Sequence, residues 1–470
     1  MNILFCTSEA SPFISTGGLG EIGGSLPKAL CSSGEDCRVV IPLYKGINAE
    51  LKKDIKFIKS LSVSVAWRNQ YCGVFEAEHS GVKYYFLDNK YYFDRDNLYG
   101  YYDDGERFAF FSRAILDMLK EVDFKPDVIH CNDWQTALVS VYHDSIYKYD
   151  DWYANIKTVF TIHNIQYQGN YSKDVLNELI GVPEEKQSIL EFNDCINLMK
   201  GGIEASRFVT TVSPTYAKEI MNPWYSHGLD CILKNREWKV KGILNGIDTE
   251  IYNPSDDNLI YENYDVNTID KKSINKCILQ KRLDLQENKN VPLLAMVTRL
   301  AEHKGIDLVE EVFERMINER DFQFVILGVG EQKYEKFFEE MARKYTGKVS
   351  CCKGFVKELS NKIYAASDMF LMPSKSEPCG LSQMIAMRYG SIPIVRKTGG
   401  LNDTVSDSGD EIGVGFTFQN YDAFDMLQAV YRALDGYKNR NGWEILVKRA
   451  MSIDNSWGNR VADYEKVYNL

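Results

Sequence analysis

Short apolar segments rich in β-branched residues alternate with amphipathic segments along most of this chain. At the N-terminus the order is NILFC, SLPKALCSSG and CRVVIPLY, which is typical of a strand, a helix and a strand. Similar apolar segments recur as DVIHC, TVFTIHN, FVTTVS and KGILNG, each followed by a loop and a helical pattern. Buried strands joined by crossover helices form parallel sheets covered on both faces. We therefore expect an α/β protein of the doubly wound type.

The alternation of strand-like and helix-like segments is interrupted once, after Asn245, and then resumes. After Asn245 comes the polar stretch IDTEIYNPSDDNLIYENYD, and beyond it the apolar segments PLLAMVTRL, QFVILG, VSCCKGF, MFLMPS and SIPIVR. The 470 residues also exceed the size at which a single hydrophobic core stops growing. We predict an N-terminal domain over residues 1–240, a C-terminal domain over residues 241–450, and a final helix over residues 451–470 that packs back on the first domain.

Composition and charge narrow the class of protein. The formal net charge is −11, from 55 Lys and Arg against 66 Asp and Glu, which favours solubility and disfavours non-specific binding to nucleic acid or anionic membranes. The 11 cysteines are scattered without a Cys-x-x-Cys spacing, which argues against a zinc site or a disulfide framework. The chain shows no signal peptide and no membrane-spanning segment, so we expect a cytoplasmic protein.

The first strand is followed by a glycine-rich loop. Ligands of open parallel sheets bind beyond the carboxyl ends of the strands, so such loops are the first place to look for a site. The loop reads SEASPFISTGGLGEIGG, and its backbone amides could approach a phosphate at a helix N-terminus. Gly18, Gly20 and Gly23 match the dinucleotide fingerprint, but they lie too far beyond the strand, and CRVVIPLY ends without a ribose-binding acidic residue. A flexible surface loop is the alternative.

Two further strands in the first half end in polar or aromatic residues. PDVIH is followed by CNDWQTAL, which places Asp133 and Trp134 where one could bind sugar hydroxyls and the other could offer a flat apolar face. Asp133 could equally be a helix N-cap. TVFTIHN places His163 at the same sheet edge, although a structural role is common for such a histidine.

The second half carries a candidate anion site. Arg299 and Lys304 follow a strand in VTRLAEHKG, at a spacing that lets both cations meet one diphosphate, although a solvated basic loop would look similar. In SEPCGLSQM, Glu377 precedes Pro378, and a helix is expected to begin near Gly380 and offer its free amides to phosphate oxygens. Glu377 could then bind glucose hydroxyls or stabilise positive charge at the anomeric carbon.

Aromatic residues make up 13% of the chain and cluster in one stretch before residue 103. Sugar rings stack on aromatic faces, but ordinary packing explains many tyrosines equally well. No Asp-x-Asp pair is placed to hold a divalent metal beside a nucleotide. We expect a reaction that needs no metal and no cofactor. The clustered residues are Tyr91, Tyr92, Phe93, Tyr99, Tyr101 and Tyr102.

These motifs resemble, in order and over almost the whole chain, those of bacterial glycogen synthases and plant starch synthases that use ADP-glucose. The similar segments are PDVIHCNDWQTAL, TIHNIQYQG, TTVSPTYAKEI, HGLDCIL, GILNGIDTEIYNP, TRLAEHKGIDL, ILGVGE, SEPCGLSQMIAMRYGSIPIVRKTGGLNDTV and the closing SW segment. TGGL also occurs twice, at residues 16–19 and 398–401, each time after a strand and before a helix.

The resemblance implies a fold, an activity and a set of site residues. It implies two facing Rossmann-like domains of the GT-B type that close over the substrates, and retaining transfer of glucose from ADP-glucose to the non-reducing end of an α-1,4-glucan such as glycogen. It implies catalytic roles for Glu377, Arg299, Lys304 and His163. We place Asp133, Trp134 and Tyr92 at the acceptor. The expected donor-binding residues are Ser15, Thr16, Gly17, Gly18, Glu21, Asn245, Ser374, Cys379, Gly380, Leu381, Gln383, Thr398 and Gly399.

The chain departs from the family pattern at three positions. The N-terminal motif of the family usually has lysine and aspartate where this chain has Ser15 and Glu21, and Phe355 stands where tyrosine is frequent. Loss of a charged contact to a phosphate costs on the order of 1.5–3 kcal/mol. Lys397, before the second TGGL, belongs to the other predicted domain and is no obvious substitute.

The expected mechanism is front-side attack by the glucan 4-hydroxyl, with Arg299, Lys304 and the helix end near Gly380 stabilising the leaving diphosphate, which accepts the proton. A covalent intermediate would need a carboxylate on the opposite face, and no residue is a convincing candidate. The alternatives are a sucrose synthase or a phosphorylase, and a degenerate protein that only binds glucan.

Overall fold

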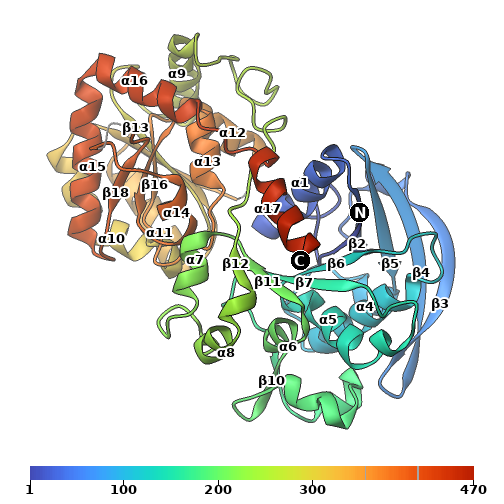
Figure 1. The fold of residues 1–470 in the computed structure, drawn as a ribbon. Coiled ribbons are helices and arrows are strands. Elements are labelled where there is room, and N and C mark those ends of the chain that lie inside the picture. Colours follow the sequence, from blue (N-terminus) through green and yellow to red (C-terminus); the bar gives the residue numbers. More distant parts are fainter. Residues whose placement is uncertain (355, 410–411) are drawn as a thin grey trace. The chain divides into compact units, whose positions relative to one another are not determined.

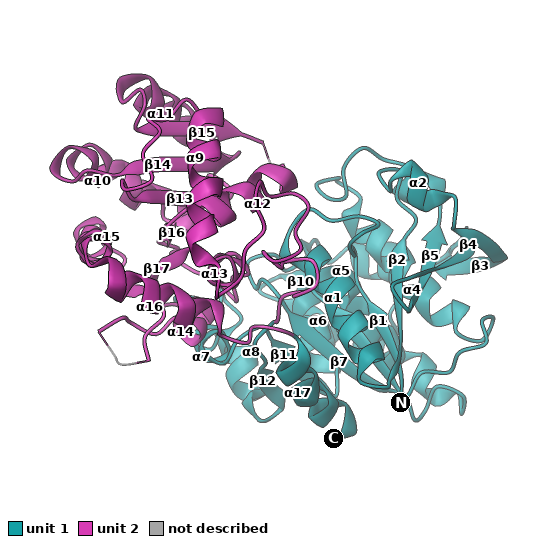
Figure 2. Cartoon of the chain, turned by 90° about the horizontal axis from the view of Figure 1, so that it is seen from above, with its two compact units in different colours: residues 1–245, 457–470 teal, residues 246–456 magenta. Residues whose placement is uncertain are grey.

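The computed structural model describes the residues 1–354, 356–409 and 412–470. The chain forms two compact units (Figure 2). The first unit combines Met1–Asn245 with Trp457–Leu470, and the second is Gly246–Ser456. The departure at Phe355 lies outside the described residues.

The first unit is built on a large, mostly parallel sheet (Figure 1). Only the pairs that include β4 are antiparallel among the described strands of this sheet. In spatial order the strands are β12 (Val240–Gly242), β11 (Phe208–Thr211), β7 (Lys157–Ile162), β6 (Val128–Asn132), β1 (Asn2–Cys6), β2 (Asp36–Pro42), β5 (Val82–Asp88), β4 (Arg68–His79) and β3 (Lys56–Val65). A small antiparallel sheet adds β8 (Asn170–Tyr171), β10 (Cys195–Asn197) and β9 (Glu191–Phe192).

The second unit has an all-parallel sheet in its described residues. Its spatial order is β15 (Val349–Lys353), β14 (Gln323–Gly328), β13 (Leu293–Val297), β16 (Met369–Met372), β17 (Ile392–Arg396) and β18 (Phe416–Phe418). The residues of β13 and β14 are all buried, as expected for strands with helices on both faces. Burial of each such Leu, Val or Ile side chain contributes about 1.5–3 kcal/mol.

Helices connect the strands and flank both sheets (Figure 1). In the first unit they are α1 (Gly18–Ser32), α2 (Ala49–Lys52), α3 (Lys90–Phe93), α4 (Asp104–Met118), α5 (Trp134–Ser145), α6 (Leu198–Ala205), α7 (Pro214–Glu219), α8 (Asp230–Asn235) and α17 (Gly458–Asn469). In the second unit they are α9 (Lys272–Arg282), α10 (Ile306–Glu319), α11 (Gln332–Lys344), α12 (Lys357–Ala366), α13 (Ser382–Arg388), α14 (Gly399–Thr404), α15 (Ala423–Lys438) and α16 (Arg440–Met451).

The strand order in each unit creates one topological switch point. In the second unit the chain winds from β13 outward to β15, returns to β16 beside β13, and then winds the other way to β18. The first unit does the same from β1, with the return at β6, although the β3–β4 hairpin is inserted before β5. At a switch point the loops that follow the two neighbouring strands diverge and leave a crevice at the carboxyl ends. Any ligand site is therefore expected after β1 and β6, and after β13 and β16.

The end of the chain is fastened to the first unit through α17. Tyr468 Oη lies 2.8 Å from Nδ1 of His130 on β6, and Lys157 Nζ donates to the carbonyl oxygen of Tyr468 at 3.0 Å. Arg207 Nη2 donates to the carbonyl oxygen of Leu470 at 2.7 Å. These contacts, of which the first is buried, the second half-buried and the third exposed, make the C-terminal helix an integral part of the first unit.

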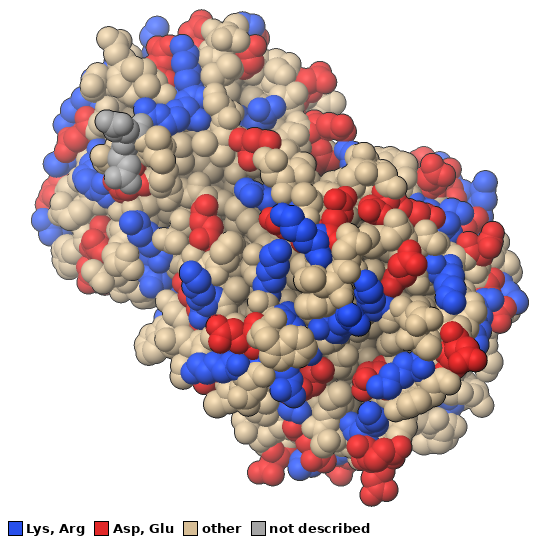
Figure 3. All heavy atoms as spheres, viewed as in Figure 1, with Lys and Arg blue, Asp and Glu red and all other residues tan. Residues whose placement is uncertain are grey.

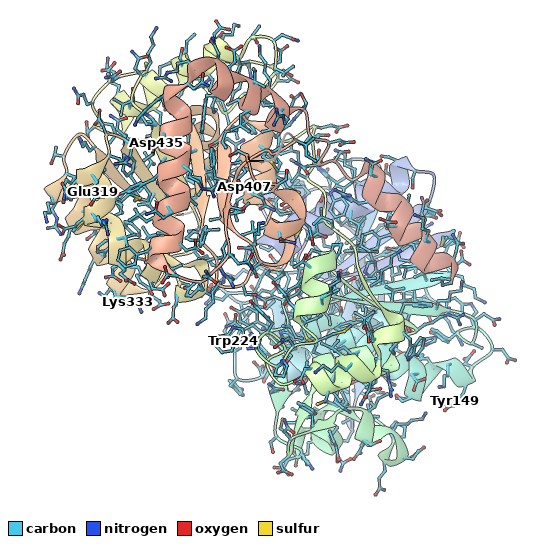
Figure 4. The ribbon with its side chains drawn as sticks, turned by 60° about the vertical axis from the view of Figure 1, so that its left-hand side comes forward. Tyr149, Trp224, Glu319, Lys333, Asp407 and Asp435 are labelled. Atoms are coloured by element: carbon cyan, nitrogen blue, oxygen red, sulfur yellow. The ribbon has the colours of Figure 1, made fainter. Side chains whose placement is uncertain are left out.

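The surface carries charges of both signs. Lys and Arg are interspersed with Asp and Glu on the face shown in Figure 3. Tyr149 and Trp224 project from the first unit with 68% and 75% of their surface exposed (Figure 4). In the second unit, Asp407, which is labelled in Figure 4, accepts hydrogen bonds from Arg432 of α15 and from Thr417 of β18. Within the described ranges, no helix has both the length and the apolar character needed to cross a membrane.

Candidate functional site

The loops that leave β13 and β16 meet at the switch point of the second unit. Lys304 Nζ donates to Glu377 Oε2 at 2.7 Å, and Ser374 Oγ donates to the same oxygen at 3.0 Å. The side chains of Lys304 and Glu377 are only 18% and 9% exposed, so water screens this ion pair weakly. The structure thus brings together Lys304, Ser374 and Glu377, which the sequence analysis predicted as site residues from two separate segments.

Backbone contacts hold the two loops in register. Gly305 has φ +74°, and a Cβ there would lie 2.1 Å from the carbonyl oxygen of Pro373. The amide of Lys375 donates to the carbonyl oxygen of His303 at 3.0 Å. Only glycine allows this approach of the two loops, which fixes where Lys304 points.

The second TGGL motif packs beneath Glu377. Gly399 has φ +44°, and a Cβ on it would lie 1.9 Å from the carbonyl oxygen of Glu377. The amide of Gly400 donates to that same carbonyl oxygen at 3.1 Å. Thr398, which precedes them, is the N-cap residue of α14. The motif therefore supports the Glu377 loop through backbone contacts.

The loop after β13 is electropositive. Arg299 is exposed, and its guanidinium makes no hydrogen bond or ion pair with any residue that the structure describes. Burial, together with the charges of Lys304 and Arg299, lowers the pKa of His303 to about 4, so this ring is neutral at pH 7. This loop carries two cations, Arg299 and Lys304, and the guanidinium of Arg299 has no partner among the described residues. The loop is therefore better suited to bind an anion than an uncharged ligand.

The block that follows Glu377 is more buried than the sequence suggested. Helix α13 begins at Ser382 with Leu381 as its N-cap, and Gly380 takes φ +72° before it. Gln383 is 0% exposed and donates from Nε2 to the carbonyl oxygens of Cys379 and Gly380 at 3.1 and 2.8 Å. Its Nε2 therefore holds the loop, whereas its Oε1 has no partner among the described residues, so a contact of Gln383 with the donor stays a prediction. Cys379 is also buried, with 4% exposure.

In the first unit, Asp133 follows β6 at the switch point. It occupies the N-cap position of α5 with φ +55°, yet its side chain makes no capping hydrogen bond. Instead Oδ1 accepts from the amides of His163 and Asn164 at 2.8 and 3.3 Å. The N-cap alternative is thus excluded. Burial, only partly offset by these two amides, raises the pKa of Asp133 to about 7.

His163 lies after β7, next to Asp133. Its Nε2 is 2.8 Å from Asn132 Oδ1, and its Nδ1 is buried without a partner among the described residues. Burial lowers the pKa of His163 to about 3, so the ring is neutral. Asn245, the last residue of the first segment of this unit, is 1% exposed, and its Oδ1 also has no partner in the described part of the chain. Buried acceptors of this kind are uncommon and are often filled by a ligand or water.

The glycine-rich loop after β1 is organised by a residue that the sequence reasoning missed. Glu9 is 3% exposed, and its carboxylate accepts hydrogen bonds from the amide and hydroxyl of Thr16 and from Tyr99 Oη. Burial raises its pKa despite these donors. Its position three residues after the buried strand β1 was a signal that the sequence offered. Through Thr16 it sets the conformation of the loop.

The predicted residues of this loop lie where α1 begins. Ser15 to Gly18 are exposed, and Ser15 Oγ donates to the carbonyl oxygen of Gly17 at 3.2 Å. Glu21 lies in the first turn of α1, which starts at Gly18. The loop therefore presents the N-terminus of α1, as expected for an anion-binding loop, but the amides of Thr16 and Gly17 donate to Glu9, and serine stands where the family usually has a lysine.

One aromatic prediction needs correction. Tyr92 is 0% exposed, and its hydroxyl donates to Glu106 Oε1 at 2.6 Å, so the structure contradicts a direct contact with an acceptor. Trp134 is 8% exposed, and its ring packs edge-on against Phe108 at 5.3 Å between centroids. A contact of Trp134 with an acceptor stays a prediction. The exposed members of the tyrosine cluster are Tyr91 and Tyr102, at 63% and 92%.

A search of the described residues for groups of at least three His, Cys, Asp or Glu side chains that could hold a metal ion finds none.

Comparisons with known proteins agree along the full chain. The family model for the starch synthase catalytic domain matches residues 2–235, and that for glycosyl transferases group 1 matches residues 279–445. A glycogen synthase of Clostridium botulinum (strain Alaska E43 / Type E3) is 50% identical over 100% of this chain and 99% of its own length. One from Anoxybacillus flavithermus is 48% identical over 100% of this chain and 98% of its own length.

The chain belongs to the glycogen synthase and starch synthase family. Among solved structures, the catalytic domain of starch synthase IV from Arabidopsis thaliana, bound to ADP and acarbose, has a TM-score of 0.93 and 35% identity over 100% of this chain and 98% of that one. Sucrose-phosphate synthase from Thermosynechococcus elongatus shares the fold alone, with a TM-score of 0.63 and 15% identity over 100% of this chain and 98% of that one. The predicted GT-B fold and the predicted class of enzyme, a retaining glucosyltransferase, are confirmed.

Proposed function

We propose that this family member transfers glucose from ADP-glucose to the non-reducing 4-hydroxyl of an α-1,4-glucan, with retention of configuration, in the cytoplasm and without a metal ion. The observation that carries the proposal is the buried Lys304–Glu377 pair at the switch point of the second unit, with Arg299 on the same loop as Lys304. The related Arabidopsis structure, which is bound to ADP and acarbose, supports a nucleoside diphosphate and a glucan-like sugar as ligands. The eleven thiols are all free, which fits a reducing compartment.

In the proposed mechanism the second unit stabilises the leaving group. Arg299, which has no competing partner among the described residues, and Lys304 meet the diphosphate as the glycosidic bond breaks. The amides at the start of α13 add partial positive charge. Glu377 holds Lys304 in place, and its carboxylate offsets the positive charge that develops at the anomeric carbon. Negative charge on the diphosphate grows towards the transition state, so these contacts favour that state over the ground state.

The first unit would supply contacts to the transferred glucose and the acceptor. The backbone amide of His163 donates to Asp133 Oδ1. Oδ2 of Asp133 and Nδ1 of His163 make no hydrogen bond with other described residues. Gly18, the first residue of α1, would offer its amide to the donor, whereas the amides of Thr16 and Gly17 are held by Glu9. With Ser15 in place of the usual lysine, the donor loses one charged contact on this side.

A donor comparison tests the proposal. With glycogen as acceptor, we expect release of nucleoside diphosphate from ADP-glucose at a higher kcat/KM than from UDP-glucose, and no transfer from glucose 1-phosphate. Preference for glucose 1-phosphate would instead favour a phosphorylase, and glycogen binding without any nucleotide release would favour a glucan-binding protein.

A further inference from the structure

Asn132 and His163 form a buried side-chain pair at the carboxyl ends of β6 and β7. Asn132 is 1% exposed and His163 is 8% exposed. His163 Nε2 and Asn132 Oδ1 are 2.8 Å apart. The direction of this hydrogen bond decides which ring nitrogen of His163 carries the proton.

The surroundings of Asn132 fix that direction. Asn132 Nδ2 lies 2.9 Å from the carbonyl oxygen of Cys6 and 3.4 Å from that of His130. Carbonyl oxygens only accept, so the side facing them must be the NH₂ group, and Oδ1 must face His163. An amide oxygen also only accepts, and Nε2 of His163 is therefore the protonated nitrogen. The backbone N–H of Asn132 donates to Thr136 Oγ1 at 2.6 Å, which further restricts the position of the residue.

Nδ1 of His163 is then an unprotonated acceptor. It is buried and has no partner among the residues that the structure describes. The titratable groups nearby do not change this. His130, on the same strand as Asn132, is kept neutral by burial, which lowers its pKa to about 3. Asp133 accepts from the backbone amides of His163 and Asn164 and not from the His163 ring, and burial together with the charge of Glu9 raises the pKa of Asp133.

We infer that Asn132 is a positioning residue that locks His163 in the Nε2–H tautomer, so that Nδ1 accepts a hydrogen bond from a hydroxyl of the transferred sugar. The contact between Nδ1 and the sugar hydroxyl rests on the proposed function, whereas the tautomer of His163 is a property of the free protein. A neutral acceptor suits the site, because a protonated ring would place positive charge near the anomeric carbon, where positive charge develops during transfer.

The tautomer can be measured directly in the unliganded protein. With ¹⁵N-labelled histidine, one of the 6 histidines disappears in His163→Gln and is thereby assigned. We expect its Nδ1 to resonate as an unprotonated nitrogen and its Nε2 as a protonated one, without titration between pH 6 and 8. An Nδ1–H tautomer, or a charged ring at pH 7, would overturn the inference.

A pair of variants tests whether Asn132 is the cause. Asn132→Leu keeps the shape and removes the acceptor, and we expect mixed tautomers at His163 and a loss in kcat/KM for ADP-glucose of about tenfold or more. Thr161→Val is the matched control, since Thr161 Oγ1 is equally buried and lies 2.6 Å from Nε2 of the neighbouring His130. It should leave the His163 signals and donor kinetics unchanged. A single Nε2–H tautomer and unaltered kinetics in Asn132→Leu would refute the role of Asn132.

Deoxy analogues of the donor test whether Nδ1 of His163 contacts a hydroxyl of the transferred sugar. We expect removal of one particular hydroxyl from ADP-glucose to lower kcat/KM about tenfold or more in the wild type and to have no further effect in His163→Ala. Additive losses at every hydroxyl would contradict a contact with His163. If ADP-glucose proved not to be a substrate at all, the proposed function would fail while the ¹⁵N spectra would still decide the tautomer.

Discussion

Neutralising Glu377 separates a catalytic role from a structural one. In the wild type, Glu377 Oε2 accepts from Lys304 Nζ at 2.7 Å and from Ser374 Oγ at 3.0 Å. Glu377→Gln keeps the shape of the side chain, and its amide oxygen can still accept from both donors. The variant loses only the negative charge.

The expected magnitudes differ for stability and for rate. A hydrogen bond to a charged group contributes about 1.5–3 kcal/mol and a neutral one about 0.5–1.5 kcal/mol, so the second unit should lose about 1–2 kcal/mol. For a domain of this size that lowers Tm by roughly 2–8 °C. If the carboxylate also stabilises charge at the reacting carbon, kcat should fall by about 10²–10³. Differential scanning calorimetry and ADP release measure the two effects.

Asp368→Asn is the matched control. Asp368 Oδ2 accepts from Lys276 Nζ at 2.6 Å and from the Leu293 amide at 2.7 Å, and so it forms a buried ion pair of the same kind at the amino end of β13. A similar loss in Tm with normal kcat is expected. If Glu377→Gln behaved like this control, with turnover preserved, Glu377 would be merely the partner of Lys304 and the charge argument would be refuted.

Four further predictions follow from the site. Ser15→Lys restores the missing cation and should lower the KM for the donor about ten- to a hundredfold; an unchanged KM would show that the loop does not contact phosphate. The pKa of Asp133, about 7 against an ordinary value of 3.8, means that the folded state keeps a proton the unfolded state loses. Wild-type stability should therefore fall between about pH 4 and pH 7 relative to Asp133→Asn, and parallel pH curves from urea titrations would contradict this. Gly399→Ala forces a Cβ to within 1.9 Å of the Glu377 carbonyl oxygen and should reduce kcat about a hundredfold, whereas Gly436→Ala, whose Cβ would lie no closer than 3.4 Å to its neighbours, should not; equal activities would exclude loop displacement. EDTA should leave turnover unchanged, and a loss that Mg²⁺ restores would disprove metal independence.

Much of the fold followed from local pattern. The alternation of buried strands and helices predicted parallel sheets in both halves, because a strand buried on both faces has no polar alternation to obscure it. The β3–β4 hairpin was missed because it is an antiparallel edge with an exposed outer strand, which includes Lys56 and Lys59. Such edges are commonly charged and carry a weak hydrophobic signal.

The site was predicted in part, for physical reasons. Lys304 and Glu377 could be found because parallel strands bring the loops after them to one sheet edge. Glu9 and Asn132 act through other residues, and no sequence spacing reveals a hydrogen bond between side chains on separate loops. Tyr91 and Tyr92 are adjacent in a short helix, where successive side chains point about 100° apart, so composition alone could not tell which one is buried.

The stereochemistry and stoichiometry of transfer test the central claim most directly. With ADP-glucose labelled at the anomeric carbon and a maltooligosaccharide primer, NMR follows the new linkage while released ADP is assayed in the same sample. We predict one ADP for each glucose added, and an α-1,4 linkage at the non-reducing end from the start of the reaction. A β linkage, or primer that stays unextended with every activated glucose supplied, would contradict the account.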